Sequence, residues 1–269
     1  MSPAAPCAQP HPEVVENGVA THVGRVRRHN EDSFLLLPKS GLWAVADGMG
    51  GHEAGLLASS TVVDVLQTIG SPTSAPDLLA RFEDRVLEAN ARLKQFARER
   101  GGEDVIVGST LAALLVYDCY FACLWSGDSR IYLMRSDRIV QLSKDHTEAQ
   151  ELVDKGVLSP EEARRWPRRN ILTHALGVHD PPELYFDHGT LQFGDTFVIC
   201  SDGLTCHVSD DEILSIATRA SSQAACDALI QLSLERGGAD NVTVLVIRFQ
   251  SHPKMARVDD ARPISGQDR

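Results

Sequence analysis

The stretch Trp43-Ala44-Val45-Ala46-Asp47-Gly48-Met49-Gly50-Gly51 decides the fold that we expect for this chain. Its first four residues form a short apolar run, which is typical of a buried β-strand. The run ends in a carboxylate, and a glycine-rich loop follows it. Two other apolar runs end in the same way, at Asp128-Ser129 and at Asp202-Gly203. The sequence therefore predicts a core of strands that carry acidic side chains at their ends.

Outward from these runs, further short strands and a few helices are expected. The predicted strands are Ser33–Leu37, Leu42–Ala46, Ser109–Tyr117, Tyr120–Ser126, Ile131–Met134, Thr196–Cys200 and Val242–Phe249. Helical spacing and capping residues predict helices from Pro76 to Gly101, after Ser209, over Ser221–Arg236 and from near Glu53. Several strands follow one another through short polar turns, which indicates antiparallel hairpins. The expected class is α+β, with antiparallel sheets covered by helices.

One domain is expected over residues 18–250, between flexible tails at 1–17 and 251–269 that are polar, contain Pro and show no period. The net charge of −11 argues against nucleic acid as the main partner, because binding to a phosphate backbone needs a basic face. No run approaches the roughly 18 consecutive apolar residues of a membrane span. The cysteines lack a Cys-x-x-Cys pair and are interpreted as buried thiols in a reducing compartment. We therefore expect a cytoplasmic monomer that binds neither nucleic acid nor membranes.

Five short acidic sites flank the predicted core strands. Besides Asp47, Asp128 and Asp202, they are Glu31-Asp32 and Asp240-Asn241, each directly before an apolar run. One Asp-Gly pair alone is an ordinary turn signal, but the repetition predicts that sheet pairing gathers these ends in one cleft. Hard oxygen ligands suit Mg²⁺ or Mn²⁺, and such cations offset the cost of burying carboxylates. Two such ions that share a water would lower its pKa to about 7, which is hydrolytic chemistry.

The most specific signal is a set of six stretches, in a fixed order, within residues 18–250. They are Gly24-Arg25-Val26-Arg27-Arg28-His29-Asn30-Glu31-Asp32, Val45-Ala46-Asp47-Gly48-Met49-Gly50-Gly51, Gly108-Ser109-Thr110, Ser126-Gly127-Asp128-Ser129-Arg130, Cys200-Ser201-Asp202-Gly203-Leu204 and Gly238-Ala239-Asp240-Asn241-Val242-Thr243. Each stretch is a weak signal alone. Together they resemble the metal-dependent PPM or PP2C family of protein serine/threonine phosphatases, in its bacterial form.

The resemblance implies a four-layer αββα sandwich, with two antiparallel β-sheets flanked by helices and a metal cleft at one edge. It implies hydrolysis of phosphoserine and phosphothreonine esters in proteins, with two Mn²⁺ or Mg²⁺ ions. In that comparison Asp47 bridges the two ions and Gly48 contributes its carbonyl oxygen. The other implied metal residues are acidic, namely Asp202 and Asp240 at one ion, Glu31 and Asp32 directly or through water, and Asp128 at a third, weaker site.

Arg27 falls at the position of the family's phosphate-binding arginine, four residues before Glu31. Its planar guanidinium suits bidentate contact with phosphate. Arg25 and Arg28 are the alternatives for this role, and a solvated surface arginine is the plainer interpretation of each.

Met49 is a departure from many eukaryotic members of the family, which have a histidine at this position as a proposed general acid. Bacterial members often have methionine there. Protonation of the leaving group would then fall to a metal-bound water or to another side chain. His146 and His174 are the candidates, with a structural role as the alternative for both.

Residues 144–182 correspond to the flap segment of bacterial members. Within it, Ser159-Pro160-Glu161-Glu162 predicts a short helix that begins with a capping box. Four arginines follow around Trp166, at positions Arg164, Arg165, Arg168 and Arg169. They are interpreted either as a solvated helix face or as a basic patch that recruits phosphorylated, acidic substrates to an acidic protein.

Two other functions fit part of the sequence. Ile199–Thr205 resembles the aspartate loop of haloacid-dehalogenase-like phosphatases, but Cys200 stands where that chemistry needs a nucleophilic aspartate. A catalytically inactive phosphoprotein-binding module of the same fold is the other alternative, although it has no need to keep every metal carboxylate. The expected partners are phosphorylated proteins and a cognate serine/threonine kinase, with a secretion-system switch as a hypothesis from overall resemblance.

Overall fold

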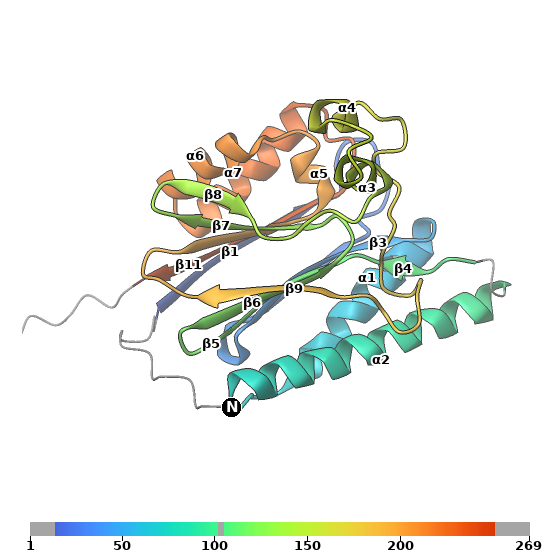
Figure 1. The fold of residues 1–269 in the computed structure, drawn as a ribbon, viewed down its shortest axis with the longest axis horizontal. Helices are drawn as coiled ribbons and strands as arrows, with labels where there is room; N and C mark the ends of the chain where they lie inside the picture. Colours follow the sequence, from blue (N-terminus) through green and yellow to red (C-terminus); the bar gives the residue numbers. More distant parts are fainter. Residues whose placement is uncertain (1–13, 102–104, 251–269) are drawn as a thin grey trace, which may run out of the picture.

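The apolar runs of the sequence form two antiparallel sheets in the computed structural model, which describes residues 14–101 and 105–250 (Figure 1). One sheet contains β1 (Val14–His22), β7 (Arg130–Arg135), β8 (Arg138–Gln141), β10 (Thr196–Cys200) and β11 (Val242–Gln250). The other contains β2 (Asp32–Leu37), β3 (Leu42–Met49), β4 (Gly108–Ser109), β5 (Leu111–Tyr117), β6 (Tyr120–Ser126) and β9 (Tyr185–Thr190). Their orders are β1-β11-β10-β7-β8 and β2-β3-β5-β6-β9, with β4 paired to β3.

The helices of the described residues lie around the two sheets. They are α1 (His52–Leu66), α2 (Ala75–Gly101), α3 (Glu148–Asp154), α4 (Pro160–Arg164), α5 (Asp202–Thr205), α6 (Asp210–Arg219) and α7 (Ser222–Glu235), with short 3-10 turns at Pro38–Ser40 and Gln67–Ile69. In Figure 1, α1 and α2 lie against the sheet of β3, whereas α6 and α7 lie against the sheet of β11. The predicted α+β class and four-layer sandwich are therefore confirmed. Within the described residues, no helix combines the length and the apolar character needed to cross a membrane.

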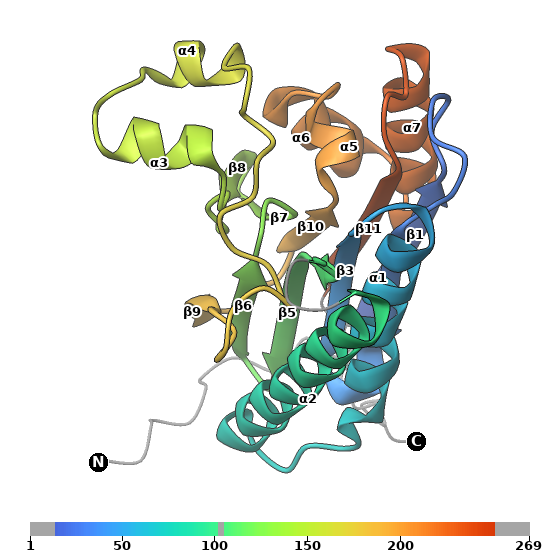
Figure 2. The ribbon, with the colours of Figure 1, turned by 90° about the vertical axis from the view of Figure 1, so that its right-hand side faces the viewer.

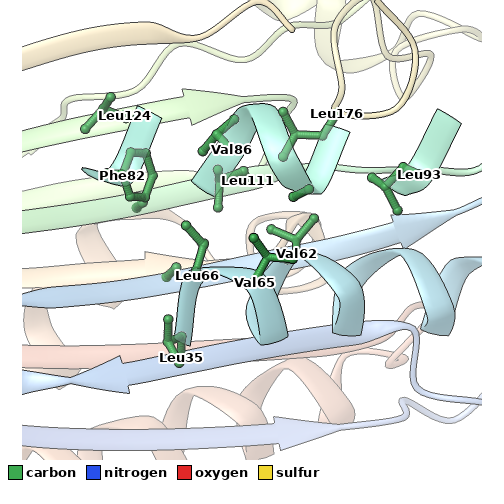
Figure 3. Close-up of a cluster of buried hydrophobic side chains, with 14 of the residues drawn as sticks. Leu35, Val62, Val65, Leu66, Phe82, Val86, Leu93, Leu111, Leu124 and Leu176 are labelled. Atoms are coloured by element: carbon green, nitrogen blue, oxygen red, sulfur yellow. The ribbon is translucent and has the colours of Figure 1, made fainter. Parts of the chain in front are cut away.

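Three clusters of buried apolar side chains lie between these layers, because each helix or sheet buries its apolar surface against a neighbouring layer. Between the two sheets, Trp43 meets Phe249 edge to face, and Phe249 meets Phe197 in the same way. Beneath the other face of β3, apolar residues at helical spacing on α2 pack against the sheet, among them Phe82, Val86 and Leu93 (Figure 3). Leu176, from the segment that follows α4, is buried in this same cluster (Figure 3).

The predicted strands are all present, with their ends shifted by up to three residues. The largest shift is in β3, which continues past Ala46 through Asp47 and Gly48 to Met49. The run Ser109–Tyr117 is divided at Thr110 into β4 and β5. The strand β1 begins at Val14, inside the segment expected to be a tail up to residue 17, because β11 offers a free edge and Val14 pairs with Gln250. The remainder of the two expected tails, 1–13 and 251–269, lies outside the described residues. The strands β1, β8 and β9 and the helices α3 and α5 are not among the predicted elements.

The cysteines differ in part from the expectation that all are thiols. Cys123, Cys200 and Cys226 are buried and free, and Cys206 is free and exposed. Cys119 is disulfide-bonded, which the expectation of a reducing compartment does not explain.

The flap segment, residues 144–182, carries α3 and α4 beyond the edges of the two sheets (Figure 2). Two isolated β-bridges attach its ends. The first joins Thr147 to Leu172, and the second joins Leu176 to Ser109 at the end of β4. The segment is therefore anchored beside the loops that carry the acidic residues.

Candidate metal centre

The ends of strands from both sheets converge on one cleft with a volume of about 510 Å³. It is lined by all of the predicted site residues except Asp32, namely Arg27, Glu31, Asp47, Gly48, Asp128, Asp202 and Asp240. Asp47 comes from the end of β3, Asp202 follows β10 and Asp240 precedes β11. The strand ends thus meet in one cleft, as the repeated pattern predicts, while the role of each residue stays a prediction.

Asp32 lies behind the cleft wall, opposite Asp47. The register of β2 and β3 pairs these two residues directly, an arrangement that is unfavourable when both carry charge. Oδ2 of Asp32 accepts a hydrogen bond from Ser201 Oγ at 2.7 Å. Oδ1 is buried and has no hydrogen-bond partner. Because a buried carboxylate oxygen without a partner is costly, this atom fits a site that a cation or its water completes.

The backbone of Asp47 is held by the Gly108-Ser109-Thr110 motif. The Asp47 N–H donates to Thr110 Oγ1 at 3.0 Å, and its carbonyl accepts from the Thr110 N–H at 2.8 Å and from Ser109 Oγ at 3.1 Å. At Gly48, an added Cβ would overlap the backbone carbonyl oxygen of Gly55 in α1. Only glycine therefore allows α1 to approach β3 at the carboxylate.

Asn241 fixes the loop that carries Arg27 and Glu31. Its Oδ1 accepts from the Glu31 N–H at 2.8 Å, and its Nδ2 donates to the carbonyls of Val23 and His29 at 2.8 and 2.9 Å. These bonds join the start of β11 to a loop about 210 residues earlier in the chain. Asn241 is a positioning residue that the sequence reasoning did not assign, although it lies inside a quoted motif.

Arg27 reaches the cleft but is bound to a predicted metal ligand. Its Nη2 donates to Asp240 Oδ2 at 2.7 Å, with the two side chains 54% and 30% exposed. This hydrogen bond raises the pKa of Arg27, and the charges of Asp240, Glu31 and Asp47 add to the effect. Of the two alternatives for phosphate binding, Arg28 lines the cleft and Arg25 does not. A cation at Asp240 would therefore compete with Arg27 for the same carboxylate.

Burial raises the pKa of the clustered carboxylates. The pKa of Asp32 rises to about 7, and that of Asp202 rises to about 6, where the charge of Asp240 adds to burial. Burial and neighbouring carboxylates also raise the pKa values of Asp47 and Asp128. The cluster therefore holds protons at a pH where isolated aspartates are ionised, unless cations neutralise it.

The metal-free protein is expected to lose stability as pH rises from about 4 to 7. An unfolded aspartate has a pKa of about 3.9, so the folded state binds more protons than the unfolded chain across this window, and the free energy of unfolding falls with pH. His146, whose pKa burial lowers to about 4, acts in the opposite direction as a single group. With chelator, the melting temperature should be lower at pH 7.5 than at pH 5, and Mn²⁺ should raise it more at pH 7.5. A Mn²⁺ effect of equal size at both pH values would contradict this account.

The donor set suits hard divalent cations. The cleft offers carboxylate and carbonyl oxygens, which Mg²⁺ and Mn²⁺ prefer. Among the described residues, no three Asp, Glu, His or Cys side chains already enclose a single point as a metal cage. Each ion would thus complete a partial shell of carboxylates with a backbone carbonyl and waters, since Mg²⁺ usually keeps several waters.

The two histidines considered as proton donors lie outside the cleft. His146 is buried, its Nδ1 accepts from the Gly127 N–H at 3.1 Å, and its ring packs against that of His174 with centroids 4.8 Å apart. His174 Nε2 lies 2.9 Å from Oε2 of Glu183, a distance at which the two side chains interact directly. Both contacts favour the structural alternative. Met49 and His29 do line the cleft, as do Asn170 and Leu172 from the flap segment, whose place no sequence pattern indicated.

Comparison with known protein sequences agrees with this geometry. The chain matches the Protein phosphatase 2C family model over residues 18–152, half of its length. It is 39% identical over 225 residues to the serine/threonine protein phosphatase PstP of Mycobacterium tuberculosis. The matched region is 83% of this chain but only 43% of PstP, so the chain spans less than half the length of that relative. It is 36% identical over 236 residues to the serine/threonine phosphatase Stp of Listeria innocua, which covers 84% of this chain and 93% of Stp.

Two solved structures are similar along almost the whole described chain. PppA, described as a key regulatory component of T6SS in Pseudomonas aeruginosa, has a TM-score of 0.80 and 39% identity, over 87% of this chain and 97% of PppA. The catalytic domain of PstP in complex with two manganese ions has a TM-score of 0.79 and 34% identity, over 88% of this chain and 99% of that domain. With its fold, its cleft and both comparisons in agreement, the chain belongs to the protein phosphatase 2C family.

Proposed function

We propose that the protein is a serine/threonine phosphatase that hydrolyses phosphoserine and phosphothreonine esters in proteins with the help of two divalent cations, Mn²⁺ or Mg²⁺. The observation that carries the proposal is that Asp47, Asp202 and Asp240 line the same cleft as Arg27. In the proposal, a site for cations thus adjoins a site for phosphate. The relatives named as phosphatases, and the manganese-bound PstP domain, support this conclusion.

The proposed residue roles are those that the resemblance to the family implies. In the proposal, Asp47 lies between the two ions, Gly48 contributes its carbonyl oxygen, and Asp202 and Asp240 hold one ion. Glu31 and Asp32 act directly or through water, and Asp128 serves a third, weaker site. When bound, the cations would activate a water as the nucleophile and offset the charge on the phosphoryl oxygens.

The chain's own contribution is orientation. In the proposal, Arg27 would bind phosphate oxygens through its guanidinium once a cation occupies Asp240. Ser109 and Thr110 fix the Asp47 backbone, and Ser201 fixes one oxygen of Asp32. Because these bonds exist before any substrate binds, the site spends little reorganisation energy during the reaction.

Phosphate release from a phosphothreonine peptide tests the proposal. The metal-stripped protein should be inactive, and added Mn²⁺ or Mg²⁺ should restore turnover. Peptide binding without turnover under either ion would instead support the catalytically inactive binding module. Trapping of a covalent aspartyl-phosphate would support the haloacid-dehalogenase-like alternative, which membership of the protein phosphatase 2C family disfavours.

The proposal extends to the cellular partner. A phosphatase of this kind opposes a serine/threonine kinase by acting on the same phosphoproteins, and we propose a cytoplasmic location for it. The likeness to PppA, a T6SS component, supports a secretion-system switch as one setting.

The proposed catalytic domain extends to residue 250 and includes β1.

A further inference from the structure

The arginine-rich part of the flap segment is folded. The Ser159 capping box begins α4, with the Ser159 N–H donating to the Glu162 carboxylate at 2.8 Å. Successive backbone turns continue beyond α4, since the N–H of Trp166 donates to Ala163 and that of Arg169 donates to Trp166. The arginines that follow Glu162 therefore have defined positions.

Three of the four arginines have no carboxylate partner within the described residues. Arg168 pairs with Glu148 of α3 at 2.8 Å, and the capping box occupies Glu162. Arg164, Arg165 and Arg169 are exposed, and none of them makes an ion pair or side-chain hydrogen bond to the part of the chain that the structure describes. We refer to these three residues as the flap arginine surface.

The flap arginine surface reaches the cleft edge at Arg169. Asn170, the residue after Arg169, lines the cleft, and so does Leu172. The bridge between Thr147 and Leu172, with a hydrogen bond of 2.9 Å from the Glu148 N–H to the Ile171 carbonyl, holds this strip in place. Burial raises the pKa of the Cys206 thiol, and the positive charge of Arg169 partly offsets that rise. Cys206 follows α5, the helix that begins at Asp202.

The charge balance of the molecule indicates what such a surface binds. With a net charge of −11, the protein as a whole repels acidic segments. Guanidinium groups beside the cleft reverse this locally, and exposed complementary charges govern partner choice and capture. We propose that the flap arginine surface docks acidic side chains that flank the phosphorylated residue of a protein substrate. This inference rests on the proposed phosphatase function.

Steady-state kinetics on matched peptides test the inference. Two phosphothreonine peptides, one with Asp and Glu flanks and one with Ser and Gln flanks, are compared in low salt with Mn²⁺. In the variant Arg164→Gln/Arg165→Gln/Arg169→Gln, the ratio of kcat/KM for the acidic over the neutral peptide should fall roughly three- to tenfold, because each exposed ion pair contributes modestly. Salt should reduce the wild-type ratio in the same direction, since it screens exposed charges.

The control variant is Arg92→Gln/Arg98→Gln/Arg100→Gln on α2, which lies on the opposite side of the sandwich (Figure 1). It makes the same change in net charge and should leave the ratio unchanged. An equal loss on both peptides in the flap variant, or the same fall in the control, would overturn the inference. If the wild type hydrolyses neither peptide with Mn²⁺, the phosphatase proposal itself fails, which is a separate result.

Discussion

Asp47→Asn is expected to lower kcat on the order of 10³-fold, the upper end of what one preorganised electrostatic group contributes. An amide keeps the shape of the side chain but removes the charge that would hold two cations together. The same change should raise the melting temperature of the metal-free protein at pH 7.5. Asp47 faces Asp32 across β2 and β3, and burial with neighbouring carboxylates raises its pKa, so its ionisation costs stability when no cation is bound.

The control for this prediction is Asp64→Asn on the exposed face of α1, which removes one negative charge away from the cleft. It should change neither kcat nor the melting temperature appreciably. Phosphate release and thermal unfolding, each measured with Mn²⁺ and with chelator, give the two readouts. Turnover within tenfold of the wild type in Asp47→Asn would show that Asp47 does not serve the cations.

Arg27→Gln should have two effects of opposite sign. Loss of the guanidinium should lower kcat/KM for a phosphothreonine peptide by about 10²-fold, because a charged donor to the phosphate is removed. The affinity for Mn²⁺ should rise by up to about fivefold, since the exposed ion pair to Asp240 contributes at most about 1 kcal/mol and no longer competes. Calorimetric titration of the metal-stripped protein with Mn²⁺ measures the second effect independently of activity.

Arg25→Gln is the matched control, because it lies in the same loop, changes the charge equally and does not line the cleft. Its backbone N–H, which donates to the Gly238 carbonyl at 2.7 Å, is retained in the variant. Weaker Mn²⁺ binding in Arg27→Gln than in the wild type would mean that the arginine supports the metal site rather than competing for it.

The central strands could be predicted from the sequence because burial on both faces leaves a continuous apolar run. The strand β10, Thr196–Cys200, is buried along its whole length, and its predicted bounds match the observed ones. The edge strand β9, Tyr185–Thr190, is the opposite case. Almost all of its residues are exposed, so it shows neither an apolar run nor alternation, and only pairing with β6 reveals it.

The first strand was missed for a different reason. In β1 the residues Glu16, Asn17 and Gly18 interrupt the apolar pattern, which made the segment resemble a tail. Gly18 is needed there because a Cβ would overlap the backbone of Ser222 in α7. A residue chosen for close packing of two elements thus weakened the local signal for one of them.

The candidate site was predictable where it depends on strand ends, and unpredictable where it depends on register and distant pairing. The sequence indicates that Asp47 and Asp202 end buried strands, which is enough to bring them together. It does not indicate that Asp32 lies opposite Asp47 with one oxygen bonded to Ser201, because that follows from the pairing register and from a distant contact. The ion pair of Arg27 joins residues 213 positions apart, beyond the reach of any local pattern.

The two β-bridges at Thr147–Leu172 and Ser109–Leu176 have a consequence for how the flap of this chain can vary. They close the flap into a loop whose ends are fixed, and the entropy of loop closure grows slowly, by about 0.6 kcal/mol for each doubling of length. Changes in the length of the exposed turns between Thr147 and Leu172 are therefore expected to cost the fold little. If the flap docks substrates as proposed, natural selection can alter which proteins are recognised there without changing the aspartates of the cleft.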